Sequence, residues 1–256
     1  MGGISEFPDY TSVQPSIRAD IEKFTRRHKP YSDFNFNNVL SWNLGGTARV
    51  SRLNNNLALQ LPDYIDGVTF YSFLGDEQVE ATASTLLDEA ERNTGIRRLR
   101  LVPEIGAVAL ADSGKFTVTE DRDGHDYTLC LPDLLEKRGA KYTHMRQELN
   151  YYTSKYGQNT AFQKLDITEP RTQAEMTQVF IGREDLKTDA SPGNDPMNEL
   201  RALNRLFAYA DPSDMATFGL RMGSELKAFI ICEKNDYDWC TGHFWKADTA
   251  YRGIYR

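Results

Sequence analysis

Residues 218–246, FGLRMGSELKAFIICEKNDYDWCTGHFWK, decide the fold of the second half of the chain. Three strand-forming runs lie within them, and Gly223-Ser224 is short enough to make a hairpin turn between the first two. The central run, LKAFIIC, is apolar nearly throughout, which is typical of an inner strand covered on both faces. These residues therefore predict a small sheet built from FGLRM, LKAFIIC and WCTGHFWK.

Helices are expected on the N-terminal side of this sheet. Apolar and aromatic residues recur with 3-4-3-4 spacing over residues 134–156, so we expect one helix with a buried stripe, ended by Gly157. A second helix is expected over residues 172–185. Asp195, followed by proline, predicts the N-cap of a third helix. The side chains expected to face the core from that third helix are Leu200, Leu203 and Phe207.

The first half also alternates helices and strands, which predicts a mixed α/β (α+β) fold. The chain has 256 residues, more than one typical domain, and we expect two domains, 1–130 and 131–256. The elements predicted in the first half are a helix over 15–28, strands over 47–53, 55–62 and 67–75 with an Asn-rich turn at Asn54 to Asn56 between the first two, a helix from Asp76 to Asn93 with Gly95 as its C-cap, and a strand over 97–103.

Composition limits the classes of function. Hydrophobic residues make up 40% and charged residues 26%, as in an ordinary globular protein, and the formal net charge is -7. That charge argues against a surface that follows DNA, although it leaves room for a local basic cleft. The sequence shows neither a membrane-spanning run nor a signal peptide, so we expect a cytoplasmic protein. The cysteines Cys130, Cys232 and Cys240 lack metal-site spacing, so we expect buried reduced thiols and no metal site.

The order helix, helix, hairpin, strand and glycine-containing loop resembles the acyl-CoA N-acyltransferases of the GNAT superfamily. Three segments narrow the resemblance: HKPYSDFNFNN (28–38), EDRDGHDYTLCLPDLLEKRGAKYTHMRQELNYYTSKYG (120–157) and GHFWKADTAYRGIYR (242–256). They resemble motifs of the bacterial phosphatidylglycerol lysyltransferase C-terminal-domain family (DUF2156). The likeness extends from about His28 to Arg256.

The resemblance implies two tandem GNAT-like domains. It also implies transfer of an activated acyl group, from acyl-CoA or aminoacyl-tRNA, to an amine or hydroxyl, with no tightly bound cofactor. Family members continue with a helix, a strand and a helix after the position of Arg256. We therefore expect a second domain that is incomplete at its C-terminal end, and a chain that self-associates or is part of a longer one.

Some positions depart from the family pattern. Ala140 and Met145 stand where the family has lysines, Gln147 where it has Asn, and Trp245 where it has Glu, whereas Asn150 is retained. Fewer lysines weaken the case for a phosphate contact on this helix. The departures keep open an alternative of a different class, a catalytically silent GNAT-like module that binds a ligand or a protein.

The resemblance assigns a donor loop to Tyr251, Arg252 and Gly253. Gly253 would let the backbone approach a phosphate, and Arg252 would pair with it. The alternative is an ordinary strand-to-helix turn with a solvated arginine. On the preceding helix, Lys141 and Arg146 would bind donor phosphates and Asn150 would position an amide, unless these residues are its solvated face.

Catalytic roles are predicted for His243 and Asp248. His243 is a candidate general base on the same strand face as Trp245, or else a core histidine with satisfied hydrogen bonds. Asp248 and Lys246 flank the end of the strand, where they would orient an amine or bind phosphate, unless they are simply solvated charges. Ser32-Asp33 is interpreted as a turn or cap, with Tyr31, Phe34 and Phe36 as core packing, and EDRDGHD (120–126) as a charged connection.

Overall fold

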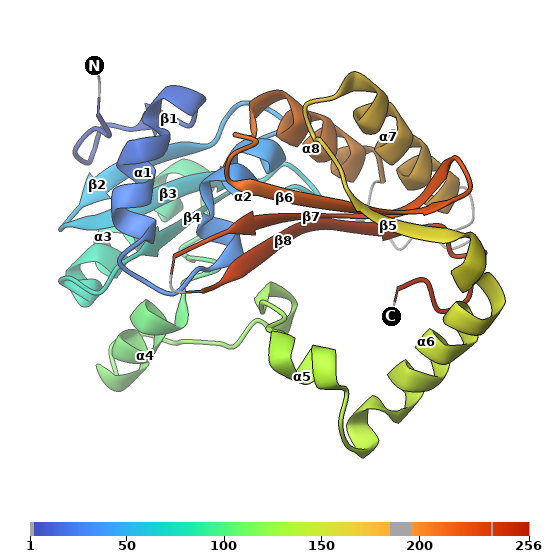
Figure 1. The fold of residues 1–256 in the computed structure, drawn as a ribbon. Helices are drawn as coiled ribbons and strands as arrows, with labels where there is room; N and C mark the ends of the chain where they lie inside the picture. Colours follow the sequence, from blue (N-terminus) through green and yellow to red (C-terminus); the bar gives the residue numbers. More distant parts are fainter. Residues whose placement is uncertain (1–2, 185–195, 237, 256) are drawn as a thin grey trace. The chain divides into compact units, whose positions relative to one another are not determined.

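The computed structural model describes residues 3–184, 196–236 and 238–255, whose elements are labelled in Figure 1. The chain divides into two compact units. One comprises Met1–Asp126 with Gly193–Tyr209, and the other Tyr127–Pro192 with Ala210–Arg256. The sequence had assigned residues 193–209 to the second domain. The helix of this segment contacts α2 of the first unit, which explains its place there.

The first unit contains a four-stranded antiparallel sheet in the order β1-β2-β3-β4. Asn54 and Asn55, with φ values of 49° and 63°, form the predicted turn between β2 and β3, as a two-residue hairpin requires. Its elements are β1 (Thr11–Ser12), η1 (Pro15–Ile17), α1 (Arg18–Thr25), η2 (Ser32–Phe34), α2 (Phe36–Trp42), β2 (Arg49–Leu53), β3 (Asn56–Pro62), β4 (Thr69–Leu74), α3 (Val79–Thr94), α4 (Glu104–Asp112), η3 (Arg122–Gly124) and α8 (Pro196–Tyr209).

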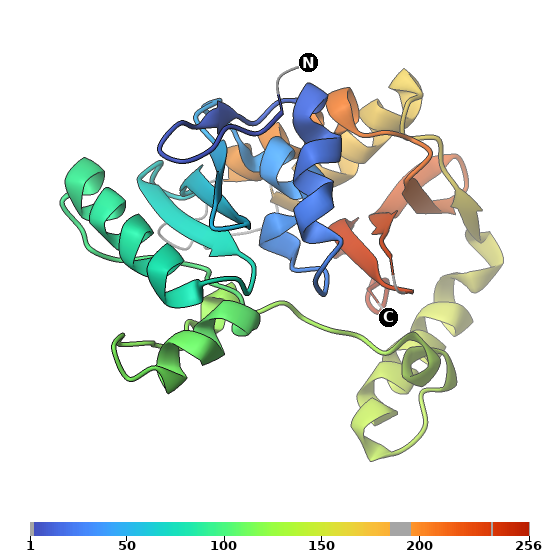
Figure 2. The same cartoon turned by 90° about the vertical axis from the view of Figure 1, so that its left-hand side faces the viewer.

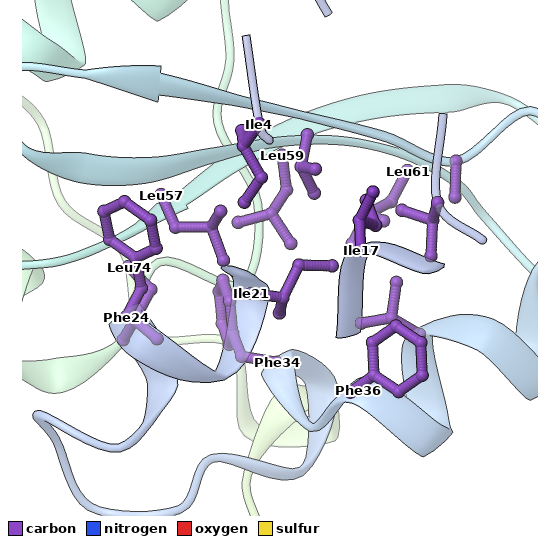
Figure 3. Packing of buried hydrophobic residues seen from close by; sticks show 14 of the residues in the cluster. Ile4, Ile17, Ile21, Phe24, Phe34, Phe36, Leu57, Leu59, Leu61 and Leu74 are labelled. Carbon is purple, nitrogen blue, oxygen red and sulfur yellow. The ribbon is translucent and has the colours of Figure 1, made fainter. Parts of the chain in front are cut away.

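Alternation along the strands gives this sheet two apolar faces. Leu57 and Leu59 of β3 join Ile17 and Ile21 in a core on one face, shown in Figure 3. On the other face, Phe73 of β4 belongs to a cluster that includes residues of α3 and α4. Helices α1 and α3 therefore lie on opposite sides of the sheet (Figure 2).

The second unit contains another four-stranded antiparallel sheet, in the order β5-β6-β7-β8. Helix α7 contacts β7 and β8 on one face (Figure 1), whereas α6 and the C-terminal loop pack on Ala228 and Ala247 of the other face. Its elements are α5 (Leu131–Glu136), η4 (Ala140–Tyr142), α6 (Thr143–Tyr156), η5 (Gly157–Asn159), β5 (Thr160–Lys164), α7 (Pro170–Glu184), β6 (Met215–Met222), β7 (Glu225–Lys234) and β8 (Cys240–Ala247).

Several sequence predictions were wrong for local backbone reasons. The helix predicted over 134–156 is two helices, because Lys137 and Gly139 have φ values of 48° and 85°. Residues 97–103 form no strand and make one parallel bridge to β4, at Leu99, before α4, which was not predicted. The N-cap of α3 is Gln78 rather than Asp76.

Other predictions hold or change in detail. Gly95 is the left-handed C-cap of α3, as predicted, and the β6–β7 hairpin forms where expected. LKAFIIC is an inner strand, but one of its faces is only half covered. The thiols of Cys130 and Cys240 are exposed rather than buried. The predicted N-cap Asp195 lies outside the described residues.

Within the described residues, no helix combines the length and the apolar character needed to cross a membrane.

Candidate functional site

The predicted donor loop packs on α6. Gly253 has a φ of 86°, and a Cβ atom added to it would lie 2.4 Å from the carbonyl oxygen of Glu148. Glycine is required here because the loop backbone approaches the helix backbone. The close approach made possible by Gly253 is therefore to a carbonyl of the chain itself, an oxygen that would repel phosphate.

Arg252 pairs with the same turn of α6. Its Nη2 donates to Oε1 of Glu148 at 2.7 Å, and its Nε lies 3.1 Å from that oxygen. The guanidinium also lies over the ring of Tyr151, 4.7 Å from the centroid. The carboxylate raises the pKa of Arg252 further. Tyr251 contributes packing, with its ring 5.3 Å from that of Tyr156.

The polar residues predicted to bind the donor from this helix, Lys141 in η4 and Arg146 and Asn150 in α6, do not form one cluster. Arg146 donates to the carbonyl oxygens of Lys137 and Gly139, so it holds the turn between α5 and α6. Lys141 makes an exposed ion pair with Asp133 at 3.1 Å, which raises its pKa. Asn150 is exposed. The first two side chains therefore stabilise the beginning of the helix.

His243 lies in a β-bulge. Ile231 pairs with Phe244 while Cys232 pairs with Gly242, so His243 is the extra residue of β8. Its side chain is 0% exposed, and Nε2 lies 2.8 Å from Oε2 of Glu233. Trp245 is half exposed, so the shared face predicted for His243 and Trp245 is wrong.

The residues at the end of β8 also have partners in the second unit. Lys246 is buried, with Nζ 5.1 Å from the centroid of the Phe180 ring. The carboxylate of Asp248 accepts from the backbone N–H of Ala250 at 3.0 Å and lies 3.5 Å from Nζ of Lys227. The structure thus brings Tyr251, Arg252 and Gly253 onto α6, whereas His243 and Asp248 occupy separate local environments.

A cavity opens on the surface of the first unit. It is a cavity of ≈ 1110 Å³, bounded by the turn at Asp33, the loop after β3, residues 97–104, α4 and residues 116–126. Both apolar and charged side chains line it. A mixed lining of this kind is typical of small-molecule sites, where a few polar groups fix the orientation of the ligand.

Two segments far apart in sequence meet at this cavity. The backbone N–H of Ser32 donates to Oδ2 of Asp126 at 3.0 Å. Gly124 lets the second segment pack closely on the wall at Leu101, because a Cβ atom there would lie 2.7 Å from Cδ2 of Leu101. Phe34 anchors the first segment in the core, where Figure 3 shows it near Ile21. The SD and EDRDGHD motifs therefore build one wall together.

The carboxylate of Asp33 is the unusual group of this wall. It makes no hydrogen bond or ion pair with the residues that the structure describes. Protein atoms lie around the carboxyl group, but the residue is exposed through the cavity, and this exposure weakens the effect of burial on the charge. Burial, and then the neighbouring charge of Asp126, raise the pKa of Asp33 to about 6. A carboxylate of this kind binds a cation or accepts a proton more readily than an ordinary surface aspartate.

The other charges of the cavity leave an excess of carboxylates. Arg100 pairs with Asp63 at 2.6 Å. Arg97 also lines the cavity but is paired with Asp88 and Glu91, and Arg98 is a further cation of the lining. The pKa of Tyr31 is raised, chiefly by burial and also by nearby carboxylates. The remaining acidic residues of the lining, besides Asp33 and Asp126, are Asp66, Glu104, Glu120 and Asp121.

Sequence reasoning missed this site. It interpreted Ser32-Asp33 as a turn, which is correct because η2 starts there, and residues 120–126 as a charged connection. The signal that connects the two segments is that both carry family-like motifs. Motif residues in two segments that lie far apart in the sequence indicate a shared site.

The comparisons with known proteins agree on the family and the fold. The family model "Phosphatidylglycerol lysyltransferase, C-terminal" matches residues 25–256. The solved structure of a conserved protein of unknown function from Bacteroides thetaiotaomicron VPI-5482 superposes with a TM-score of 0.76 at 19% identity. The superposition covers 96% of this chain and 82% of that one, so the fold is shared. No match was found among curated proteins.

Proposed function

The chain belongs to the phosphatidylglycerol lysyltransferase C-terminal family, and from that premise we propose that it transfers an activated acyl or aminoacyl group to an amine or hydroxyl acceptor. The donor is an aminoacyl-tRNA or an acyl-CoA. Each unit has a four-stranded antiparallel sheet with helices packed on it, an arrangement consistent with the two tandem GNAT-like domains that the family resemblance implies.

The observation that carries the proposal is the Asp33 carboxylate in the cavity of the first unit, which has no partner in the part of the chain that the structure describes. An amine must lose a proton to attack an acyl carbon, and a base with a pKa near the working pH accelerates that transfer. Asp33 takes the proton of the acceptor nitrogen or oxygen. The new bond to the acyl carbon forms as the ester or thioester bond to the donor breaks, and the leaving oxygen or sulfur gains a proton.

The carboxylates around Asp33 also favour a cationic substrate. Asp126 is fixed by the Ser32 backbone N–H, so one of its oxygens is held in place at the wall. An ammonium group that enters the cavity donates charge-assisted hydrogen bonds to carboxylate oxygens, of which the one on Asp126 is already oriented. We place the acceptor, or the amine of an aminoacyl donor, in the first unit.

The donor side remains a proposal for the second unit. The family resemblance assigns Lys141, Arg146, Arg252 and Gly253 to donor phosphates. Their internal contacts mean that a donor must compete with Glu148 for Arg252 and with backbone carbonyls for Arg146. His243 could act as a base only if a substrate displaced Glu233 from its ring nitrogen, because the ring is buried against that carboxylate.

A transfer assay tests the proposal. Purified protein is incubated with lysyl-tRNA and phosphatidylglycerol vesicles, or with acetyl-CoA and a polyamine, and the acceptor is analysed by mass spectrometry. We expect an acylated acceptor with one of these pairs, and its loss in Asp33→Asn. An acylated acceptor formed equally well by Asp33→Asn would contradict the role of this carboxylate.

A second function, a catalytically silent binding module, is favoured by the internal pairing of Arg252, Gly253 and His243. It predicts thermal stabilisation by polyamines that depends on Asp33, with no stabilisation by CoA thioesters and no product with any donor. Stabilisation of the protein by acetyl-CoA would argue for the transferase.

A further inference from the structure

Two cysteines of the second unit lie diagonally across the β7–β8 hairpin. Cys232 of β7 pairs with Gly242, and Lys234, two residues later, pairs with Cys240 of β8. Successive side chains alternate between the faces of a strand, so Cys232 and Cys240 are on the same face. Diagonal neighbours on one face are within reach of each other.

Among the described residues, no side chain fills the space beside Gly242, on the face that carries the two cysteines. Gly242 lacks a side chain, and a Cβ atom placed there would meet no atom within 4 Å. The thiols interact: burial, and next the proximity of Cys240, raise the pKa of the Cys232 thiol to about 12. Cys240 is exposed, so a reagent in solution reaches it first.

We propose that Cys232 and Cys240 are a redox pair that forms a reversible intramolecular disulfide with a small disulfide oxidant such as oxidised glutathione. The Cys240 thiolate attacks one sulfur of the oxidant, whose S–S bond breaks and releases one glutathione thiolate, which takes up a proton. Cys232 then loses its proton and attacks the Cys240 sulfur, which releases the second glutathione. Two protein thiols are oxidised, and one glutathione disulfide is reduced to two thiols.

The geometry indicates what the disulfide changes. A disulfide needs Cβ atoms about 3.5–4.5 Å apart, closer than ordinary diagonal neighbours, so oxidation draws the ends of β7 and β8 together. The next residue of β7, Glu233, is the partner of the bulged His243. The disulfide therefore locks the strand ends beside this buried pair. This inference does not depend on the transferase proposal.

Thiol counting tests the pair. The reduced full chain, with its three cysteines, is incubated with oxidised glutathione, denatured in acid and urea, labelled with iodoacetamide and weighed by mass spectrometry. We expect three labels per chain to fall to one, with the remaining label on Cys130 by peptide mapping. Dithiothreitol should restore all three labels. Three labels after oxidation, or glutathione retained on Cys240 without loss of the Cys232 label, would overturn the proposal.

Cysteine variants distinguish an intramolecular disulfide between Cys232 and Cys240 from other reactions of the thiols. Cys130→Ser is the matched control, and we expect it still to lose both of its labels on oxidation. Cys240→Ser changes an exposed side chain, so it should fold, and its Cys232 should stay labelled. The oxidised wild type should remain monomeric on a non-reducing gel. Loss of the Cys232 label in Cys240→Ser, or a covalent dimer as the main product, would contradict an intramolecular pair.

Discussion

The two units differ in whether the polar side chains of their motifs have internal partners. In the second unit, the side chains of Arg252, Arg146 and His243 each form a hydrogen bond with another residue of that unit. These partners satisfy the hydrogen-bonding groups of the three side chains. In the first unit, Asp33 is exposed at the lining of a cavity and has no hydrogen-bond or ion-pair partner among the described residues. A charge that is neutralised internally stabilises the fold. A charge held without a partner costs stability, and this is the physical basis for our proposal that a ligand or a reaction step uses Asp33.

The largest expected effect is the fall in the transfer rate that the substitution Asp33→Asn should cause. Loss of a general base lowers the rate by about 10²–10⁴-fold, while the cavity keeps its shape because Asn is isosteric with Asp. The measurement is the rate of acceptor acylation with the donor that supports activity in the wild type. Asp112→Asn, on an exposed residue at the end of α4 outside the cavity lining, is the control and should keep its rate. Equal losses of transfer rate in Asp33→Asn and Asp112→Asn would show that Asp33 has no special role in the transfer.

Gly253→Ala is expected to give the largest loss of stability in the second unit. Its Cβ would collide with the Glu148 carbonyl, and alanine is strained at a φ of 86°, so we expect a cost of about 2–4 kcal/mol. Gly223→Ala is the matched control. It has a φ of 61° but no atom within 4 Å of the added Cβ, so its cost should be about 1–2 kcal/mol. Urea unfolding measures both, and equal costs would show that the contact with α6 is unimportant.

The pH dependence of the stability tests whether the Asp33 carboxylate destabilises the folded chain. Its pKa in the folded state is about 6, above its ordinary value of 3.8, so the folded state binds the proton more tightly than the unfolded state. Asp33 therefore lowers stability progressively as the pH rises from about 4 to 6, and this loss remains at higher pH. Asp33→Asn should be more stable than the wild type at pH 8, with a smaller difference at pH 4. A variant less stable than the wild type at pH 8 would contradict this.

Arg252→Ala should have the smallest effect. The guanidinium is largely exposed, so loss of its pair with Glu148 should lower the melting temperature less than Gly253→Ala does. If the pair is structural, the transfer rate should fall far less than in Asp33→Asn. A loss of transfer as large as that of Asp33→Asn, at unchanged stability, would instead support the donor-loop role of Arg252.

Much of the fold could be predicted from local patterns. The β6–β7 hairpin, the Asn54-Asn55 turn and the Gly95 cap each depend on a few neighbouring residues with strong backbone preferences. The break between α5 and α6 could not be predicted, because Lys137 adopts a left-handed backbone that its side chain does not signal. The placement of α8 in the first unit depends on contacts with α2, which are distant in sequence.

The candidate site was harder to predict for the same reason. Residue type suggested His243 as a base, but a bulge in β8 turns it toward Glu233, and bulges leave little trace in a strand pattern. Asp33 looked like a turn residue because it is one. Its second property, a raised pKa, arises first from burial and then from Asp126, which lies more than ninety residues away and becomes its neighbour only in the folded chain.

The most direct test of the account is a carbon NMR titration of the Asp33 side-chain carboxyl group in the full chain. We predict a midpoint near pH 6, which should fall in Asp126→Asn because the neighbouring negative charge is removed while the amide oxygen can still accept from Ser32. The transfer rate should rise with pH through the same midpoint. A midpoint near 4 that does not respond to Asp126→Asn would contradict the account, because Asp33 would then be an ordinary solvated carboxylate.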